Sequence, residues 1–218
     1  MLYFSSLQSD KLNLRGQHMG AQVFWDVIGN YNRQTWIIQI ALLIFLLIAV
    51  ALSYTKKIKW AAKFSLGIIN LFIGIGFFAW YGTEPIQKFF AFPLYITCGV
   101  LFLYESLHNK DDILKTPTAF QMFLLVLYLA YPFVSILLGN SFPQMVTYIM
   151  PCPVISISMT VYAGYKRKNK LLLALLTILG LTGIKSVIFN AYEDIILLIC
   201  GLYGIVLLAN EIRQSSKK

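Results

Sequence analysis

The chain has 218 residues, of which 58% are hydrophobic and only 12% are charged. Soluble domains carry roughly 25% charged residues, so this composition excludes an ordinary soluble protein. The formal net charge of +9 would suit a nucleic-acid partner in a soluble protein. Most of the Lys and Arg, however, lie in short loops between apolar stretches, where they set membrane orientation and meet anionic lipid. We therefore expect the lipid bilayer as a partner, and no nucleic acid.

Seven apolar stretches, each long enough to cross a bilayer, fill most of the chain. Because lipid offers no water to backbone amides, they predict an all-α, polytopic bundle of seven transmembrane helices. In chain order the predicted spans are residues 36–54, 60–81, 86–104, 119–138, 144–162, 171–189 and 195–210. Trp and Tyr residues near several of these ends suit the headgroup boundary. No internal repeat is evident, so we expect one transmembrane domain, over residues 36–212.

The segments outside this domain are short. Residues 1–18 contain no apolar stretch typical of a signal peptide, and we interpret them as a disordered or non-native tail. In residues 19–35, the order of Phe24, Trp25, Val27, Ile28 and Tyr31 predicts an interfacial helix that leads into the first span. Residues 213–218 form a basic tail.

Basic residues gather on one side of the predicted bundle. They cluster at residues 56–63, 110–115, 166–170 and 213–218, which all follow or precede the same ends of the spans. Loops rich in Lys and Arg stay in the cytoplasm. We therefore expect an outer N-terminus and a cytoplasmic C-terminus, in a multi-pass protein of the bacterial cytoplasmic (inner) membrane.

The fifth predicted span contains a backbone defect at Pro151 and Pro153. Each proline lacks an N–H and disrupts the bond to the carbonyl one turn earlier, so the break must be covered by neighbouring helices, water or a bound ion. Beyond it, Cys152, Ser156 and Thr160 recur every four residues and share one helix face. These residues form a candidate solute or ion site. The alternative is a kinked structural helix whose hydroxyls bond back to its own carbonyls.

A charged group is expected at the outer ends of the sixth and seventh spans. Lys185 precedes Glu193 and Asp194 across a short turn. Because charge inside a membrane is costly, Lys185 is expected to pair with one of these carboxylates or to reach the headgroups. In the alternative, Glu193, Asp194 and Glu84 form an acidic outer mouth that attracts cations, tuned by Lys185.

Two further kinds of polar residue lie inside predicted spans. Cys98 and Cys200 are expected at depths similar to that of Cys152, and three converging thiols would suit a soft metal ion. Buried free Cys more commonly acts as a small hydrophobe, and no Cys-x-x-Cys spacing supports a metal. Asn70, near the centre of the second span, is expected to hydrogen-bond to another helix and is included in the candidate solute site.

Enzymatic motifs are absent from the sequence. The two histidines, His18 and His108, lie in the tail and in a cytoplasmic loop, so they do not form an intramembrane metal site. No Ser/His/Asp set and no phosphate-binding Gly loop is present. Glu105, Asp111 and Asp112 lie near His108 and are interpreted as part of a solvated loop. We predict no catalytic residues, no cofactor and no enzyme.

Several short motifs carry a resemblance. They are Phe24-Trp25, Tyr31-Asn32-Arg33, Phe78-Ala79-Trp80, Pro151-Cys152-Pro153 and Glu193-Asp194. In combination they resemble a family of uncharacterised bacterial multi-pass membrane proteins, from about Met19 to the end of the last span. The resemblance implies a seven-helix membrane protein and directs attention to Cys152, Glu193 and Asp194, but it implies no substrate. Cys98 and Cys200 are not part of the family pattern.

The resulting hypothesis is transport or sensing of a small solute or cation. The solute would enter past Glu84, Glu193 and Asp194 and meet the broken helix at Pro151 to Pro153. The alternative from another class is a non-catalytic scaffold or partner subunit. A cavity around Cys152 would favour the first hypothesis, and a tightly filled centre the second.

Overall fold

The computed structural model describes residues 2–83, 87–185 and 191–215, with side chains described for 22–83, 88–184 and 191–214. In these ranges all the regular elements are helices, and there is no β-strand. Two isolated β-bridges pair Leu114 with Tyr165 and Ser141 with Gln144. The prediction of an all-α fold is therefore confirmed.

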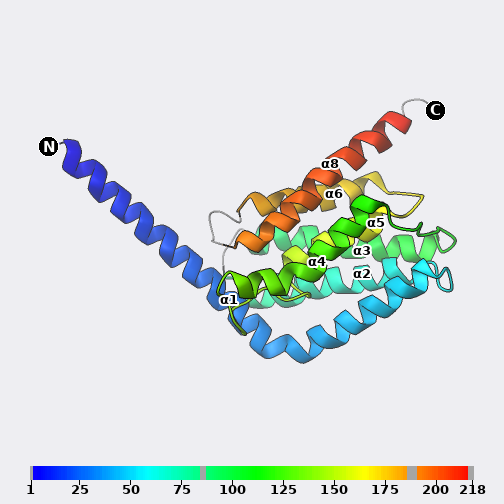
Figure 1. The fold of residues 1–218 in the computed structure, drawn as a ribbon, viewed down its shortest axis with the longest axis horizontal. Coiled ribbons are helices and arrows are strands. Elements are labelled where there is room, and N and C mark those ends of the chain that lie inside the picture. The colour runs from blue at the N-terminus through cyan, green and yellow to red at the C-terminus, as the bar shows by residue number, and fades with distance from the viewer. Residues whose placement is uncertain (1, 84–86, 186–190, 216–218) are drawn as a thin grey trace.

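The helices follow one another as α1 (Leu2–Tyr54), α2 (Ala61–Phe72), η1 (Ile73–Tyr81), η2 (Gln87–Ala91), α3 (Phe92–His108), α4 (Ala119–Leu137), α5 (Pro151–Ala163), α6 (Lys170–Leu181), η3 (Thr182–Lys185), η4 (Tyr192–Asp194) and α8 (Ile195–Ser215). The short segments η1 and η2 are π-helical, and η3 and η4 are 3₁₀-helical. Figure 1 shows that α1 changes direction and then lies alongside α2.

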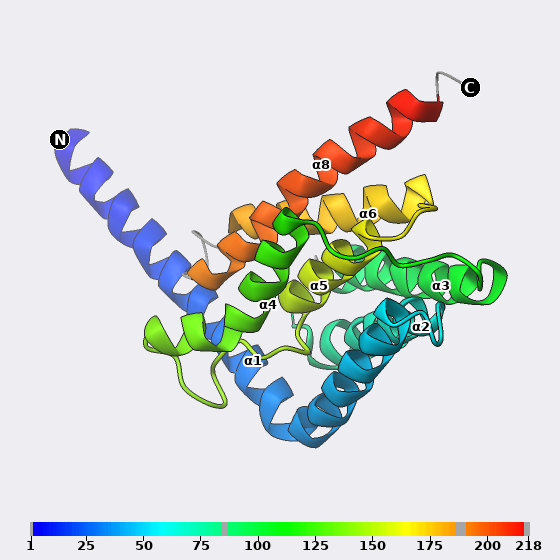
Figure 2. The same cartoon turned by 45° about the vertical axis from the view of Figure 1, so that its right-hand side comes forward.

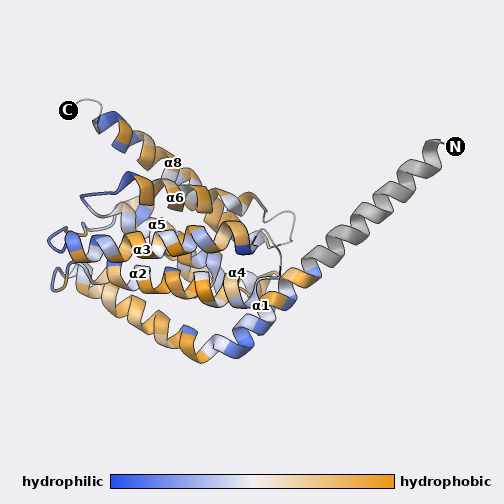
Figure 3. Cartoon of the chain, turned by 180° about the vertical axis from the view of Figure 1, so that it is seen from behind, coloured by the Kyte–Doolittle hydropathy of each residue, from blue (hydrophilic) through white to orange (hydrophobic). Residues whose placement is uncertain are grey.

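Five helices of the described chain are long and apolar enough to cross a membrane, namely Gln22–Tyr54, Ala61–Tyr81, Lys88–His108, Ala119–Leu137 and Tyr192–Gln214. They correspond to the first four predicted spans and the last. Large apolar side chains such as Ile44, Val126 and Ile205 are exposed on them, as expected of faces that meet lipid tails. The hydrophilic loops after α1, α3 and α5 gather at one end of the bundle (Figure 3), which is the end where the basic residues were expected.

The fifth and sixth predicted spans differ from the structure. Helix α5 has 13 residues and α6 has 12, so both are shorter than the helices that could cross the membrane. Residues 144–150 are not helical, so the prediction of a helix starting at residue 144 is wrong. Pro151 occupies the first turn of α5 instead of interrupting it, because proline lacks the N–H that a first turn leaves unbonded anyway.

Polar residues of α1 hold the non-helical segment before α5. The side-chain amide of Asn32 donates to the carbonyls of Pro143 and Met145, both at 2.8 Å. The hydroxyl of Thr147 donates to Gln39 Oε1 at 2.7 Å. These bonds satisfy two backbone carbonyls, which a helix would have paired internally, and the Thr147 hydroxyl. The non-helical segment is therefore held against α1.

Helix α5 forms the centre of the bundle. It contacts α2, α4, α6 and α8, and Figure 2 shows it surrounded by other helices. Of its residues, all except Cys152 are buried. A short helix buried on every side cannot be a lipid-facing span, so α5 acts as the core around which the longer helices pack.

Glycines permit two close helix crossings. A Cβ at Gly180 of α6 would lie 2.6 Å from the Cα of Gly201 in α8. A Cβ at Gly99 of α3 would lie 3.0 Å from the carbonyl oxygen of Gly67 in α2. Small residues allow backbones to approach in membrane bundles, where packing drives helix association.

Candidate functional site

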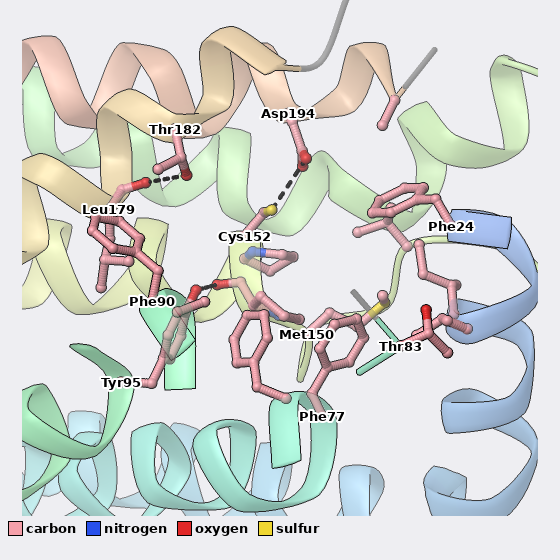
Figure 4. A pocket seen from close by; sticks show the side chains of 18 of the residues that line it. Phe24, Phe77, Thr83, Phe90, Tyr95, Met150, Cys152, Leu179, Thr182 and Asp194 are labelled. Atoms are coloured by element: carbon pink, nitrogen blue, oxygen red, sulfur yellow. Dashed lines mark hydrogen bonds between the residues drawn. The ribbon is translucent and has the colours of Figure 1, made fainter. Parts of the chain in front are cut away.

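A cavity of about 450 Å³ lies beside the N-terminal end of α5. Its volume falls within the range typical of small-molecule sites, roughly 300–1,000 Å³. Pro151, Cys152 and Pro153 form one part of the wall, and Asp194 lies next to Cys152 (Figure 4). The two prolines at the start of α5 therefore border the cavity, whereas the rest of the helix is packed against its neighbours.

Elements far apart in the sequence supply the other walls. Phe24 comes from α1, Phe77 and Phe78 from η1, Phe90 from η2 and Tyr95 from α3. The π-helical geometry of η1 changes the direction of side chains relative to an α-helix, and such segments often occur at functional sites. The cavity is therefore lined mainly by aromatic and aliphatic side chains.

Besides Thr83 and Thr182, the cavity wall carries a hydrogen-bonded polar pair, Cys152 and Asp194. The Cys152 thiol donates to Asp194 Oδ2 across 3.1 Å, as Figure 4 shows. Asp194 occupies the last position of η4, directly before α8. The second carboxylate oxygen, Oδ1, is buried and accepts no hydrogen bond from the described residues. A buried acceptor without a partner is costly, so Asp194 retains capacity to bind a further donor or a positive charge.

Tyrosines from neighbouring helices satisfy the backbone around the prolines. The Tyr31 hydroxyl donates to the carbonyl of Ile149, and the Tyr95 hydroxyl donates to the carbonyl of Pro151, both at 2.8 Å. The sequence predicted that neighbouring helices, water or an ion would cover this defect. In the structure, side chains of α1 and α3 bond to these two carbonyls.

Glu193 lies close to the cavity but is not among the residues that line it. It is 1% exposed, and its Oε1 accepts a hydrogen bond from Ser135 at 2.8 Å. The Asn140 side chain approaches the same oxygen at 3.5 Å. Glu193 Oε2 has no hydrogen-bond partner among the described residues. Glu193 therefore ties the start of α8 to the end of α4, while Asp194 faces the cavity.

The remaining members of the candidate solute site lie elsewhere in the bundle. Ser156 bonds to the Cys152 carbonyl and to Tyr131, and Thr160 bonds to the Ser156 carbonyl. Asn70 donates to the Ser158 hydroxyl of α5 at 3.1 Å. None of Ser156, Thr160 and Asn70 lines the cavity. Their contacts are those of helix packing, as the structural alternative for the fifth span describes.

The three cysteines differ in how far they are buried. Cys98 and Cys200 are fully buried, whereas Cys152 is partly exposed. In the described ranges, no group of three or more His, Cys, Asp and Glu side chains is placed to hold a metal ion. Cys98, Cys152 and Cys200 therefore do not form a three-thiol metal site in this structure.

Two of the predicted outer-mouth charges cannot be placed. Glu84 lies outside the described residues, and Lys185 ends η3 with a side chain that is likewise outside them. The expected pairing of Lys185 with Glu193 or Asp194 stays a prediction.

A second buried polar cluster was missed by the sequence analysis. Lys63 is fully buried, and its Nζ lies 2.8 Å from both Glu105 Oε2 and Asp112 Oδ2. The Tyr162 hydroxyl donates to Glu105 Oε1 at 2.6 Å. The interpretation of Glu105 and Asp112 as part of a solvated loop is therefore wrong, because the loop after α3 folds back against Lys63. An ionisable residue in the first turn of an apolar helix was the signal for this cluster.

Residues 21–218 match the model of a family of unknown function, DUF6064. The chain belongs to this family. The match confirms the resemblance to an uncharacterised family, and it leaves the individual motifs untested. No curated protein and no solved structure matches the chain. For this DUF6064 protein, the functional argument therefore rests on the geometry of the cavity.

Proposed function

We propose that this protein is an integral membrane protein that binds a small solute or cation in the cavity beside α5, for transport or sensing. The observation that carries the proposal is the pair formed by the Cys152 thiol and the Asp194 carboxylate, 3.1 Å apart on a cavity wall. A mostly apolar pocket with a few convergent polar groups is the usual form of a small-molecule site.

The course of the chain supports transport. A non-helical segment, residues 144–150, leads into α5, which ends at Ala163. Many transporters place their binding sites at discontinuous helices of this kind, where irregular backbone lines a cavity. In this protein the interrupted end of the helix contributes Pro151, Cys152 and Pro153 to the cavity wall.

The charge distribution supports an orientation. The cavity lies at the opposite ends of α2 and α5 from the basic loops that precede α2 and follow α5. Because basic loops stay in the cytoplasm, we propose that the cavity opens toward the outside of a cytoplasmic membrane. The outer position of the N-terminus follows from the same rule.

A scaffold or partner subunit is the second candidate. The buried, hydrogen-bonded residues Ser156, Thr160 and Asn70 fit that function as well as they fit transport. The cavity at Cys152 favours solute binding, since a scaffold needs no open space at that place. We propose no catalytic activity and no resident metal or cofactor.

Thiol labelling of Cys152 tests the proposal. In a variant carrying Cys98→Ala and Cys200→Ala, intact cells are treated with a membrane-impermeant maleimide. Modification of Cys152 is expected, because an outward-opening cavity gives the reagent an aqueous path. A matched variant that also carries Cys152→Ala gives the background. If Cys152 reacts only after denaturation in detergent, the cavity is sealed and the scaffold function is favoured.

A further inference from the structure

The charge inside the cavity has one sign. Among the described residues that line it, Asp194 is the charged side chain, and no Lys, Arg or His accompanies it. No ion pair in the described chain involves Asp194. Asp194 lines the cavity, and with Oδ2 bonded to Cys152 and Oδ1 buried without a partner, its carboxylate retains unused capacity to accept hydrogen bonds.

The rest of the wall is aromatic. Phe77, Phe78 and Phe90 bring rings to the same cavity, and Tyr95 adds a fourth. The Tyr95 hydroxyl is engaged by the Pro151 carbonyl, so its ring is the part left for a ligand. Aromatic faces carry a negative quadrupole and attract organic cations, such as quaternary ammonium groups, within about 6 Å.

The start of α5 is a poor anion site despite its position. Helix N-termini bind anions through free N–H groups. Pro151 and Pro153 have no N–H, and the N–H of Val154 already donates to the Met150 carbonyl at 2.9 Å. In the first turn of α5 this leaves Cys152 as the residue whose N–H could serve an anion. The start of α5 therefore offers an anion at most one N–H, next to a carboxylate that repels it.

An inorganic cation also fits this wall poorly. In the described ranges, no set of three or more metal-binding side chains converges, and rings and prolines cannot replace a hydration shell. A hard cation such as Ca²⁺ takes six to eight oxygen ligands. The cavity of about 450 Å³ instead has room for an apolar body attached to the charge.

We infer that the ligand of this cavity is a small organic cation, an amine or quaternary ammonium compound with an aromatic or aliphatic body. The Asp194 carboxylate receives the positive group, and the rings of η1, η2 and α3 enclose the apolar body. The inference rests on the proposed function and names the chemical class that the site would select.

Three probes that share a phenyl ring and differ in charge test the charge selectivity of the cavity. The probes are benzyltrimethylammonium, benzyl alcohol and phenylacetate, titrated calorimetrically into the purified full-length protein. The cation is expected to bind at least about tenfold more tightly than the neutral or anionic probe, as a desolvated ion pair with cation–π contacts predicts. Asp194→Asn should remove this preference. Asp111→Asn, the same change at an exposed carboxylate, should leave it intact.

Three results would overturn the inference in different ways. Equal or tighter binding of benzyl alcohol or phenylacetate, together with protection of Cys152 from maleimide by that probe, would keep the cavity as a binding site and refute the cationic ligand. Binding of no probe, with Cys152 inert in the native protein, would refute both the inference and the proposed function. Preference for the cation that survives Asp194→Asn would place recognition at another site.

Discussion

Replacement of Lys63 tests the buried cluster that joins α2, α3 and the loop after α3. The Lys63→Met variant keeps most of the side-chain volume but removes the positive charge that lies 2.8 Å from both Glu105 and Asp112. Two carboxylates, 2% and 8% exposed, would then share a site without a cation. Removing one partner of a buried ion pair costs roughly 3–5 kcal/mol.

The expected loss is large enough to measure by thermal unfolding. For a chain of this size, 1 kcal/mol shifts the melting temperature by roughly 2–4 °C, so Lys63→Met should lower it by about 6–20 °C. Lys59→Met is the matched control, since Lys59 is partly exposed and its nearest carboxylate oxygen, on Asp111, is 4.0 Å away. This change should cost less than about 1 kcal/mol.

A rescue experiment separates charge from packing. Adding Glu105→Gln and Asp112→Asn to Lys63→Met removes the uncompensated charges and should recover much of the lost stability. A melting temperature of Lys63→Met within 2–3 °C of wild type, read with the same roughly 2–4 °C per kcal/mol, would refute the reasoning. So would a triple variant that is less stable than the single one.

Three further substitutions test the contacts that shape the bundle and its cavity. Gly201→Ala should destabilise the protein by roughly 1–3 kcal/mol, because its Cβ would lie 2.5 Å from the Gly180 carbonyl carbon. The control is Gly76→Ala, whose Cβ would meet nothing nearer than 3.7 Å. Thermal unfolding should show this control to be close to neutral. Asn32→Ala frees the carbonyls of Pro143 and Met145, and we expect faster proteolysis between residues 138 and 150 than in wild type; an unchanged cleavage rate would contradict this. Tyr95→Phe removes the hydroxyl that donates to the Pro151 carbonyl and should cost roughly 1–3 kcal/mol of stability. The loss would be measured as a lower melting temperature. Tyr104→Phe, the same change at an exposed position, should leave the melting temperature unchanged.

The sequence was sufficient to predict the fold class because lipid leaves few choices for an apolar chain. It could not show that residues 144–150 are not helical. Asn32 donates to the Met145 carbonyl and Gln39 accepts from the Thr147 hydroxyl, more than 100 positions away, and hydropathy cannot show such partners. The same residues lengthened the predicted fifth span, although Pro151 is equally suited to begin a helix.

The candidate site could be predicted only in part. The sequence singled out Cys152 beside the two prolines of the fifth apolar stretch and Asp194 before the last one, and the structure places them in contact. Ser156 and Thr160 share a helix face with Cys152 but lie further along α5, where the helix is packed, and helical spacing alone does not show where along the helix the cavity ends. Lys63 was counted with the loop lysines, since its carboxylate partners arrive from the end of α3 and the loop beyond it.

If an aqueous cavity presents Cys152 and Asp194 to positively charged solutes, the reactivity of Cys152 will depend on the charge of the reagent. The measurement compares two methanethiosulfonate reagents, one with a trimethylammonium group and one with a sulfonate, on Cys152 in the variant with Cys98→Ala and Cys200→Ala. Each rate is divided by that of the same reagent with a free thiol in solution. We expect the cationic reagent to react faster, and Asp194→Asn to bring the ratio of the two rates close to one. Failure of both reagents to modify native Cys152, while the denatured protein reacts fully, would show that no such cavity reaches the thiol.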